Sequence, residues 1–97
     1  MNTKAIQPIG ANTKTFDGLT DTISAKTKPV RPGIYKAREV NPQPRTPFNW
    51  SFFKDGFWGP LVRDIKDAEM EWELERVKAR HGRKVPKRQH EWRGVEK

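Results

Sequence analysis

The chain has 97 residues, with 20 Lys or Arg against 12 Asp or Glu, and its formal charge is +8. A chain of this length holds one small domain at most, because short chains bury little surface against the entropy of ordering the backbone. Cysteine is absent, which excludes disulfides and thiolate metal sites. Only 33% of the residues are hydrophobic, a composition close to that of disordered proteins, although four Trp and five Phe are costly to leave in water.

The strongly positive charge predicts an anionic partner, which could be nucleic acid, an acidic protein surface or an anionic membrane surface. The longest uncharged apolar stretch, Pro47 to Phe53, is far shorter than the ~20 residues that a membrane-spanning helix needs. The N-terminus lacks the apolar core of a secretory signal and the arginines of a mitochondrial presequence, so neither is expected.

Charge and composition divide the chain into four segments. They are an extended, basic, proline-containing arm at 1–47, an aromatic knot at 48–59, an amphipathic helix at 60–81 and a basic tail at 82–97. The fold class predicted from them is mostly irregular or extended, with one long α-helix at about 60–81 and a small aromatic turn or hairpin at about 48–58. No autonomous globular core is expected.

The arm is rich in proline between Lys26 and Arg45. Each proline removes an amide donor and favours extended geometry in the residue before it. We therefore expect an extended or polyproline-like segment that lies over a foreign surface, anchored by Val30, Ile34, Tyr35 and Val40. A flexible tail is the alternative.

The aromatic knot holds six of the ten aromatic residues within eleven positions. Phe48, Trp50 and Phe52 alternate with period two, which indicates a short extended segment. Lys54-Asp55-Gly56 reads as a turn in which Gly56 adopts a positive φ. A two-stranded unit is marginal in water, so these rings require the following helix or a partner.

The helix is expected to begin with Gly59 as N-cap and Pro60 at its first position, and to end before Gly82. One apolar stripe consists of Leu61, Ile65, Ala68, Trp72 and Ala79, and a second, on the opposite side, of Met70, Leu74 and Val77. Two stripes predict a helix packed between two surfaces. Its acidic residues stand four apart, as Glu71 and Glu75 do, so a basic neighbour would stabilise them.

The tail surrounds one aromatic residue with cations, a pattern that suits phosphate neutralisation plus base stacking but equally suits an acidic protein surface. The residues predicted to bind an anionic surface are Arg83, Lys84, Lys87, Arg88, Trp92 and Arg93. No helix-turn-helix, zinc-finger or RNA-recognition signature is present, and the acidic first half of the helix would repel phosphate.

Catalytic and metal chemistry are not expected. The chain offers His81, His90, Ser24 and Ser51, without a metal-binding motif such as HExxH and without a glycine-rich phosphate loop. We therefore predict no enzymatic activity, no cofactor and no metal site.

In composition and layout, the chain resembles small accessory subunits of mitochondrial respiratory complexes, mitochondrial ribosomes or the protein lattice inside ciliary microtubules. The leading hypothesis is a non-enzymatic structural subunit of a multi-subunit assembly, most simply a mitochondrial respiratory-chain-type complex, with several protein partners and no homo-oligomer. The alternatives are a ribosomal protein whose arm and tail contact rRNA, a microtubule-lattice protein, and contact with a membrane surface. The predicted partner-binding residues are Tyr35, Trp50, Phe53, Phe57, Trp58, Leu61, Ile65, Trp72, Leu74 and Val77.

Overall fold

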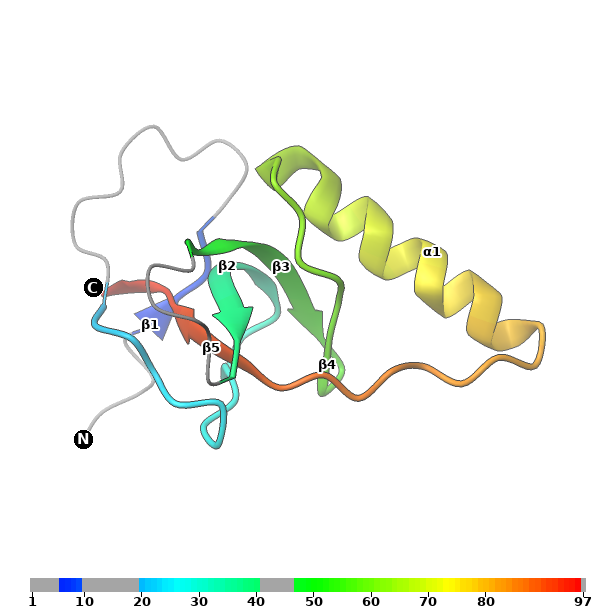
Figure 1. Ribbon diagram of the computed structural model, residues 1–97, viewed down its shortest axis with the longest axis horizontal. Helices are drawn as coiled ribbons and strands as arrows, with labels where there is room; N and C mark the ends of the chain where they lie inside the picture. Colours follow the sequence, from blue (N-terminus) through cyan, green and yellow to red (C-terminus); the bar gives the residue numbers. More distant parts are fainter. Residues whose placement is uncertain (1–5, 10–19, 41–46, 97) are drawn as a thin grey trace.

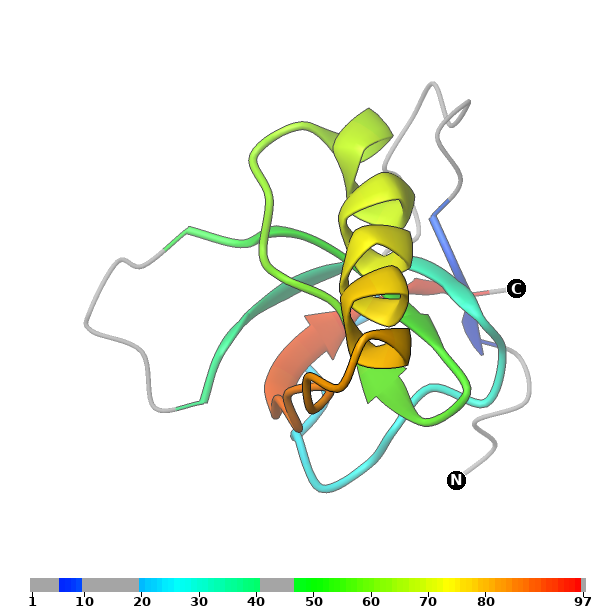
Figure 2. The same cartoon turned by 90° about the vertical axis from the view of Figure 1, so that its right-hand side faces the viewer.

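A four-stranded antiparallel sheet, curled into a half-barrel, forms the centre of the molecule. The computed structural model describes residues 6–9, 20–40 and 47–96. The strands lie in the spatial order β4 (Phe57–Trp58), β3 (Asn49–Lys54), β2 (Gly33–Glu39) and β5 (His90–Arg93), and a separate pair joins β1 (Ile6–Gln7) to β6 (Val95–Glu96). Figure 1 shows the single helix packed beside this sheet, and Figure 2 shows the curl of the strands.

Strand β2 is central because it pairs with β3 on one side and with β5 on the other. Its register places Ile34 opposite Phe52 and Ala37 opposite Trp92. Side chains alternate between the two faces of a strand, so both faces of β2 and β3 present large apolar groups. A sheet of this kind can be buried on both sides.

The first face carries an aromatic cluster. Tyr35 and Trp92 meet edge to face at 5.0 Å between ring centroids, and Tyr35 and Trp58 do so at 5.9 Å. Ala37 and Phe53 complete the buried cluster. The polar atoms of these rings are satisfied: Tyr35 donates its hydroxyl proton to the Arg31 carbonyl at 2.7 Å, and burial raises the pKa of Tyr35 to about 12.

The opposite face packs against the helix. Ile34 and Phe52 contact Ala68 and Trp72, and the rings of Phe52 and Trp72 lie edge to face at 5.5 Å. Trp72 also donates its indole N–H to the Phe57 carbonyl at 3.1 Å. Such aromatic pairs stabilise by about 0.5–1.5 kcal/mol beyond the area they bury, so the helix is fastened to the sheet chiefly through Trp72.

The helix begins later than the sequence predicts. A 3-10 turn, η2 (Ile65–Asp67), leads into α1 (Ala68–Arg80), and the Asp64 carboxylate caps this start by accepting from the Lys66 amide at 3.2 Å. The expected start at Gly59 and Pro60 is wrong, because the backbone there already pairs with β3. Val62 and Trp50 exchange two backbone hydrogen bonds of 2.8 and 2.9 Å.

Two local turn predictions are confirmed. Gly82 ends the helix with a φ of +91°, and its amide bonds the Ala79 carbonyl at 3.2 Å. Gly56 has a φ of +83° and the preceding Asp55 a φ of +55°, so Asp55-Gly56 forms the two-residue turn between β3 and β4. Turns with two positive φ values match the twist of antiparallel strands.

The predicted fold class, mostly irregular with one long helix at 60–81, a hairpin at 48–58 and no autonomous core, is wrong. The hairpin exists, but it is part of a larger sheet, and the proline-containing arm supplies the central strand β2. The radius of gyration is 13.1 Å, close to the ~13 Å of a compact domain of about 100 residues and far below the ~30 Å of an unfolded chain. The part of the arm at 41–46 lies outside the described residues.

This core predicts a sharp contrast between two aliphatic truncations. Ile34→Ala should lower the free energy of unfolding by about 2–5 kcal/mol, because Ile34 is buried between the sheet and Trp72. Val30→Ala, at a side chain that is 64% exposed, should change it by no more than about 0.5 kcal/mol. Urea unfolding of the isolated chain, followed by tryptophan fluorescence, measures both. A broad, non-cooperative transition of the unmodified chain would contradict a self-supporting core.

Candidate functional site

Helix α1 covers only part of the sheet face on which it lies. Ile34 and Phe52 are under the helix, whereas the next side chains on the same face, Lys36 and Trp50, pair opposite each other further along the strands. Arg93 stands opposite Lys36 on β5. Two positions further along each strand direction, the same face carries Arg38 after Lys36 and Phe48 before Trp50. We call Lys36, Arg38, Phe48, Trp50 and Arg93 the basic–aromatic face.

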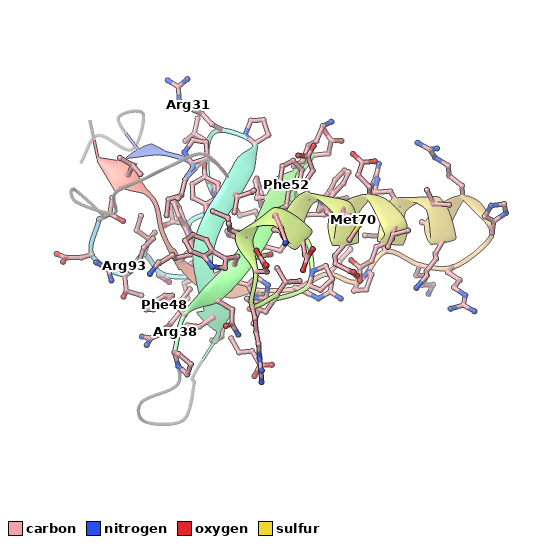
Figure 3. All side chains as sticks on the ribbon, turned by 90° about the horizontal axis from the view of Figure 1, so that it is seen from above. Arg31, Arg38, Phe48, Phe52, Met70 and Arg93 are labelled. Carbon is pink, nitrogen blue, oxygen red and sulfur yellow. The ribbon has the colours of Figure 1, made fainter. Side chains whose placement is uncertain are left out.

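Two arginines lie over one phenylalanine ring in this face. The guanidinium carbon of Arg38 is 4.5 Å from the ring centroid of Phe48, and that of Arg93 is 5.8 Å from it. Figure 3 shows Arg93, Phe48 and Arg38 grouped beside β2, away from Met70 on the helix. Contact between a guanidinium and an aromatic ring is attractive through the negative face of the ring, so the ring helps to position both cations.

A hydrogen bond at Nε fixes each of the two guanidinium groups. Arg38 donates from Nε to the Glu91 carboxylate at 3.0 Å, and Arg93 donates from Nε to the Thr20 carbonyl at 2.7 Å. Among residues 6–9, 20–40 and 47–96, no acceptor is bonded to the terminal nitrogens of either arginine. Both groups are therefore held in place while their paired terminal N–H donors remain available to an anion.

The rest of the face adds one cation and one ring. The Lys36 ammonium lies 5.3 Å from the centroid of Trp50. Among the described residues, Glu91 is the carboxylate whose ion pair with this face is seen, and its pair with Arg38 is about three-quarters buried on both sides. The face keeps a local excess of positive charge that attracts anions.

The predicted partner-binding residues are mostly used inside the chain. Tyr35, Phe53, Trp58 and Trp72 are buried in its own two aromatic clusters. Leu61 and Ile65 pack against these clusters, Trp50 lies in the basic–aromatic face and Phe57 is half-buried on β4. Of the predicted partner-binding residues, Leu74 and Val77 are exposed, at 45% and 44%, and Met70 on the same helix is 51% exposed.

The predicted anion-binding residues of the tail are separated by the fold. Arg83, Lys84 and Lys87 are exposed on the segment that runs back along the helix. Trp92 is buried and donates its indole N–H to the Thr27 carbonyl at 2.6 Å. Arg93 alone joins the basic–aromatic face.

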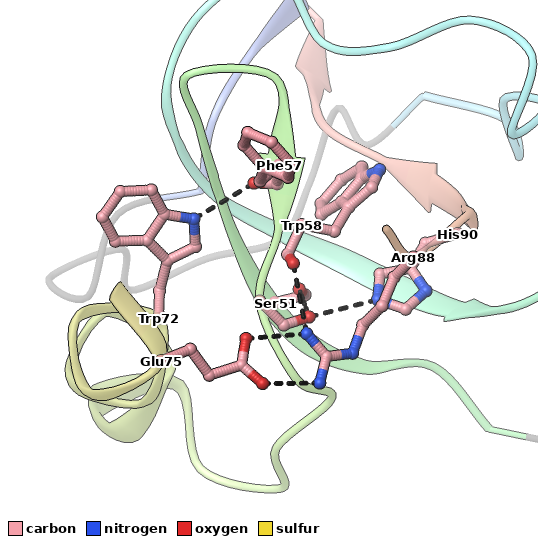
Figure 4. A network of polar contacts seen from close by, with 8 residues as sticks. Ser51, Phe57, Trp58, Trp72, Glu75, Arg88 and His90 are labelled. Carbon is pink, nitrogen blue, oxygen red and sulfur yellow. Dashed lines mark hydrogen bonds and ion pairs between the residues drawn. The ribbon is translucent and has the colours of Figure 1, made fainter. Parts of the chain in front are cut away.

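Arg88 belongs to an internal ion pair. Its two terminal nitrogens donate to the two carboxylate oxygens of Glu75 at 2.7 and 2.6 Å, and one also contacts the Trp58 carbonyl at 3.4 Å. The basic neighbour that the acidic helix requires is therefore supplied, for Glu75, by the chain's own tail. Figure 4 shows this pair joining α1 to the segment before β5.

The same network contains the buried histidine, but it has no catalytic arrangement. Ser51 donates its hydroxyl proton to the Gly59 carbonyl at 2.8 Å, and His90 Nε2 lies 3.3 Å from that same oxygen. Serine and histidine thus share an acceptor and do not bond each other, whereas nucleophilic catalysis needs a serine that donates to the base. The contacts in Figure 4 hold the hairpin, α1 and β5 together.

The described residues contain no cluster of three or more His, Cys, Asp or Glu side chains that could hold a metal ion. No helix in that part of the chain is long and apolar enough to cross a membrane.

Comparisons of the sequence and of the fold with family models, curated proteins and solved structures find no match. The function must therefore be argued from the geometry of the site.

Sequence analysis missed Lys36, Arg38 and Phe48 as functional residues. A signal for the first two was present, because Ile34, Lys36 and Arg38 alternate with Tyr35 and Ala37. That period of two predicts a strand with one basic face. The prolines on either side of this segment led instead to the prediction of an extended arm.

The buried histidine predicts acid sensitivity. Burial, more than the neighbouring Arg88, lowers the pKa of His90 below its usual 6.5, against the opposing effects of the Gly59 and Gln89 backbone and of Glu39. Below pH ~6.5 the unfolded chain binds a proton that the folded chain does not, so the free energy of unfolding should fall as the pH decreases towards the folded-state pKa.

The test compares His90→Gln with His81→Gln, since His81 is exposed at the end of α1. Urea unfolding at several pH values between about 7 and 5 should show a weakened pH dependence in His90→Gln and the original dependence in His81→Gln. The same dependence in both variants would show that His90 is not its source.

Proposed function

We propose that the chain binds nucleic acid through the basic–aromatic face. The observation that carries the proposal is the pair of guanidinium groups over the Phe48 ring, each fixed at Nε by an acceptor of the chain. Their terminal N–H donors match the geometry of phosphate oxygens and can bond them in pairs. Phosphate contacts supply most of the affinity in sequence-independent binding.

Other features of the face support a nucleic acid over an acidic protein. Phe48 and Trp50 place aromatic surface among the cations, and bases stack on aromatic and guanidinium planes. A nucleic acid uses both kinds of group in each nucleotide, because every phosphate is linked to a base that can stack. The proposal is closest to the rRNA-binding alternative derived from the sequence, with the contact moved from the arm and tail to the sheet.

The leading hypothesis from the sequence, a structural subunit that depends on its assembly, loses its main argument. That argument was the lack of a core, and most of the rings predicted to bind a partner lie in the chain's own core: Tyr35, Phe53, Trp58 and Trp72. Its mitochondrial or ciliary setting remains only a proposal from composition.

The nucleic-acid proposal predicts a salt-dependent interaction that depends on the two arginines. A fluorescent RNA hairpin with a stem and an open loop, titrated with the chain at several salt concentrations, measures the affinity by fluorescence anisotropy. Arg38→Gln and Arg93→Gln should each reduce the slope of log K against log salt by about 0.7–0.9, because each removes one phosphate contact. The double variant should bind at least about tenfold more weakly in low salt.

Arg31→Gln is the matched control, because it removes the same charge at the opposite end of β2 from the basic–aromatic face, as Figure 3 shows. It should alter affinity much less than either face variant. Equal losses in all three variants would mean that net charge, not this face, governs binding. An unmodified chain that does not bind the hairpin at low salt would exclude the proposed function.

A protein partner at the outer face of α1 is the second candidate. Met70, Leu74 and Val77 form an exposed apolar stripe there, as the sequence predicts for a helix that packs on two sides. A stripe of this kind is typical of helices that bind a protein surface.

This second candidate predicts that Leu74→Glu releases the chain from the complex it forms in its own cells, because a carboxylate would be buried without a partner. Val30→Glu changes a more exposed aliphatic residue outside the helix and should have no effect. Sedimentation of the cell extract, with the chain detected in each fraction, distinguishes bound from free protein. If Leu74→Glu remains in the heavy fractions, the stripe is not a docking surface.

A further inference from the structure

The chemistry of the basic–aromatic face also bears on which form of nucleic acid it accepts. The face consists of two rows of side chains: Trp50, Lys36 and Arg93 lie opposite one another in the first, and Phe48 contacts Arg38 in the second, with Glu91 opposite Arg38 on β5. Residues two apart on a strand are separated by about 7 Å, and neighbouring strands by about 4.8 Å. The whole face is therefore about 7 by 10 Å and its cationic part, on β2 and β5, about 7 by 5 Å, narrower than the ~12 Å major groove that separates the two backbones of a duplex.

Negative charge limits the surface on the side of β3. Val62 pairs directly with Trp50, and the segment that follows Val62 carries a run of acidic residues through η2 and α1. Asp67, Glu69, Glu71 and Glu73 give this segment a negative excess, although Arg63 lies in it, Asp64 is paired with Lys66 and Glu75 is paired with Arg88. A duplex whose one backbone lay on the arginines would place its second backbone beyond the face, and the helix side would repel those phosphates. A single strand can run over β2 and β5 without meeting this charge.

The stacking surface is useful only to an unpaired base. The guanidinium carbon of Arg38 lies 4.5 Å from the Phe48 centroid and the group is held at Nε by Glu91, so guanidinium and ring are already assembled in contact. Bases of a duplex already stack on one another, whereas bases of a single strand are free to stack on protein planes. The Phe48 ring, which also positions both arginines, therefore adds to the phosphate contacts a surface on which an unpaired base can stack.

We infer that the basic–aromatic face binds single-stranded nucleic acid, with a base stacked at Phe48 and Arg38 and a phosphate bonded by Arg93. The inference rests on the proposed function and narrows it to one class of ligand. It assigns separate roles to the ring and to the cations: the ring selects unpaired bases, and the cations supply the salt-dependent affinity.

The first test compares one labelled DNA strand of mixed sequence with the same strand annealed to its complement, at equal ionic strength. We expect the single strand to bind the unmodified chain at least about tenfold more tightly, which corresponds to one stacked base. Equal affinity, or tighter binding of the duplex, would overturn the inference and leave the proposed function in place. Binding of neither form would overturn both.

The second test uses variants of the ring. Phe48→Leu should weaken single-strand binding about tenfold without changing the salt slope, because it removes a stacking surface and no charge. Phe48→Tyr, which keeps the plane, should retain the affinity. Phe57→Leu is the control, since this half-buried ring lies on β4 outside the face. The urea midpoint of each variant shows whether it has folded.

The outcomes of the second test separate a selective from a structural role. An unchanged single-strand affinity in a folded Phe48→Leu would overturn the inference. So would an equal loss for the single strand and the duplex, because a ring that only supports the arginines affects both forms alike. Loss in Phe48→Tyr as well as in Phe48→Leu would likewise contradict a stacking role.

Discussion

Burial of both faces of the β2–β3 pair is the constraint on which the rest of the structure depends. One face is closed by Trp58 and Trp92, the other by Trp72 on the helix. Each buried aromatic side chain removes about 150–250 Å² from water. A few such residues therefore supply what a chain with 33% hydrophobic residues would otherwise lack, and the segments that carry them are fixed relative to one another.

This two-sided packing also explains why the composition was misleading. An average over all residues counts the charged helix surface and the proline-rich connections together with the strands. The apolar residues are concentrated where they alternate, as in Tyr35 and Ala37 on one face of β2 and Ile34 on the other. Hydrophobic patterning at a period of two is a better indicator of a small β domain than the total hydrophobic content.

Local features were predictable and pairings over long distances were not. The turn at Gly56 and the helix end at Gly82 follow from the conformational freedom of glycine at positive φ. The start of the helix was misplaced because Val62 bonds Trp50 across the sheet, a contact that no local signal reveals. Strand β5 was missed for the same reason: its pairing with β2 joins residues more than fifty positions apart, and Trp92 reads as an isolated aromatic in a basic tail.

The candidate site could not be predicted from the sequence either, because its residues are brought together only by the register of the strands. Arg38 and Arg93 come from segments that the sequence assigns to different functions, and only the pairing of β2 with β5 brings them to one ring. The fold also separates the charges that the sequence interleaves, because Arg88 neutralises Glu75 at the helix while the sheet retains its cations.

The two arginines of the face could not be replaced by lysines without loss of geometry. A guanidinium can bond an acceptor through Nε, lie flat on a ring and still direct two N–H groups outward, whereas an ammonium is a point charge without a plane. In this site Glu91 and Thr20 hold the Nε atoms, Phe48 contacts both guanidinium groups, and no acceptor among the described residues is bonded to the terminal nitrogens. Cations needed only for solubility or for long-range attraction would not have to be fixed in this way. Fixing them costs side-chain entropy when the chain folds. A ligand that binds these groups then does not have to order them, which makes its binding free energy more favourable.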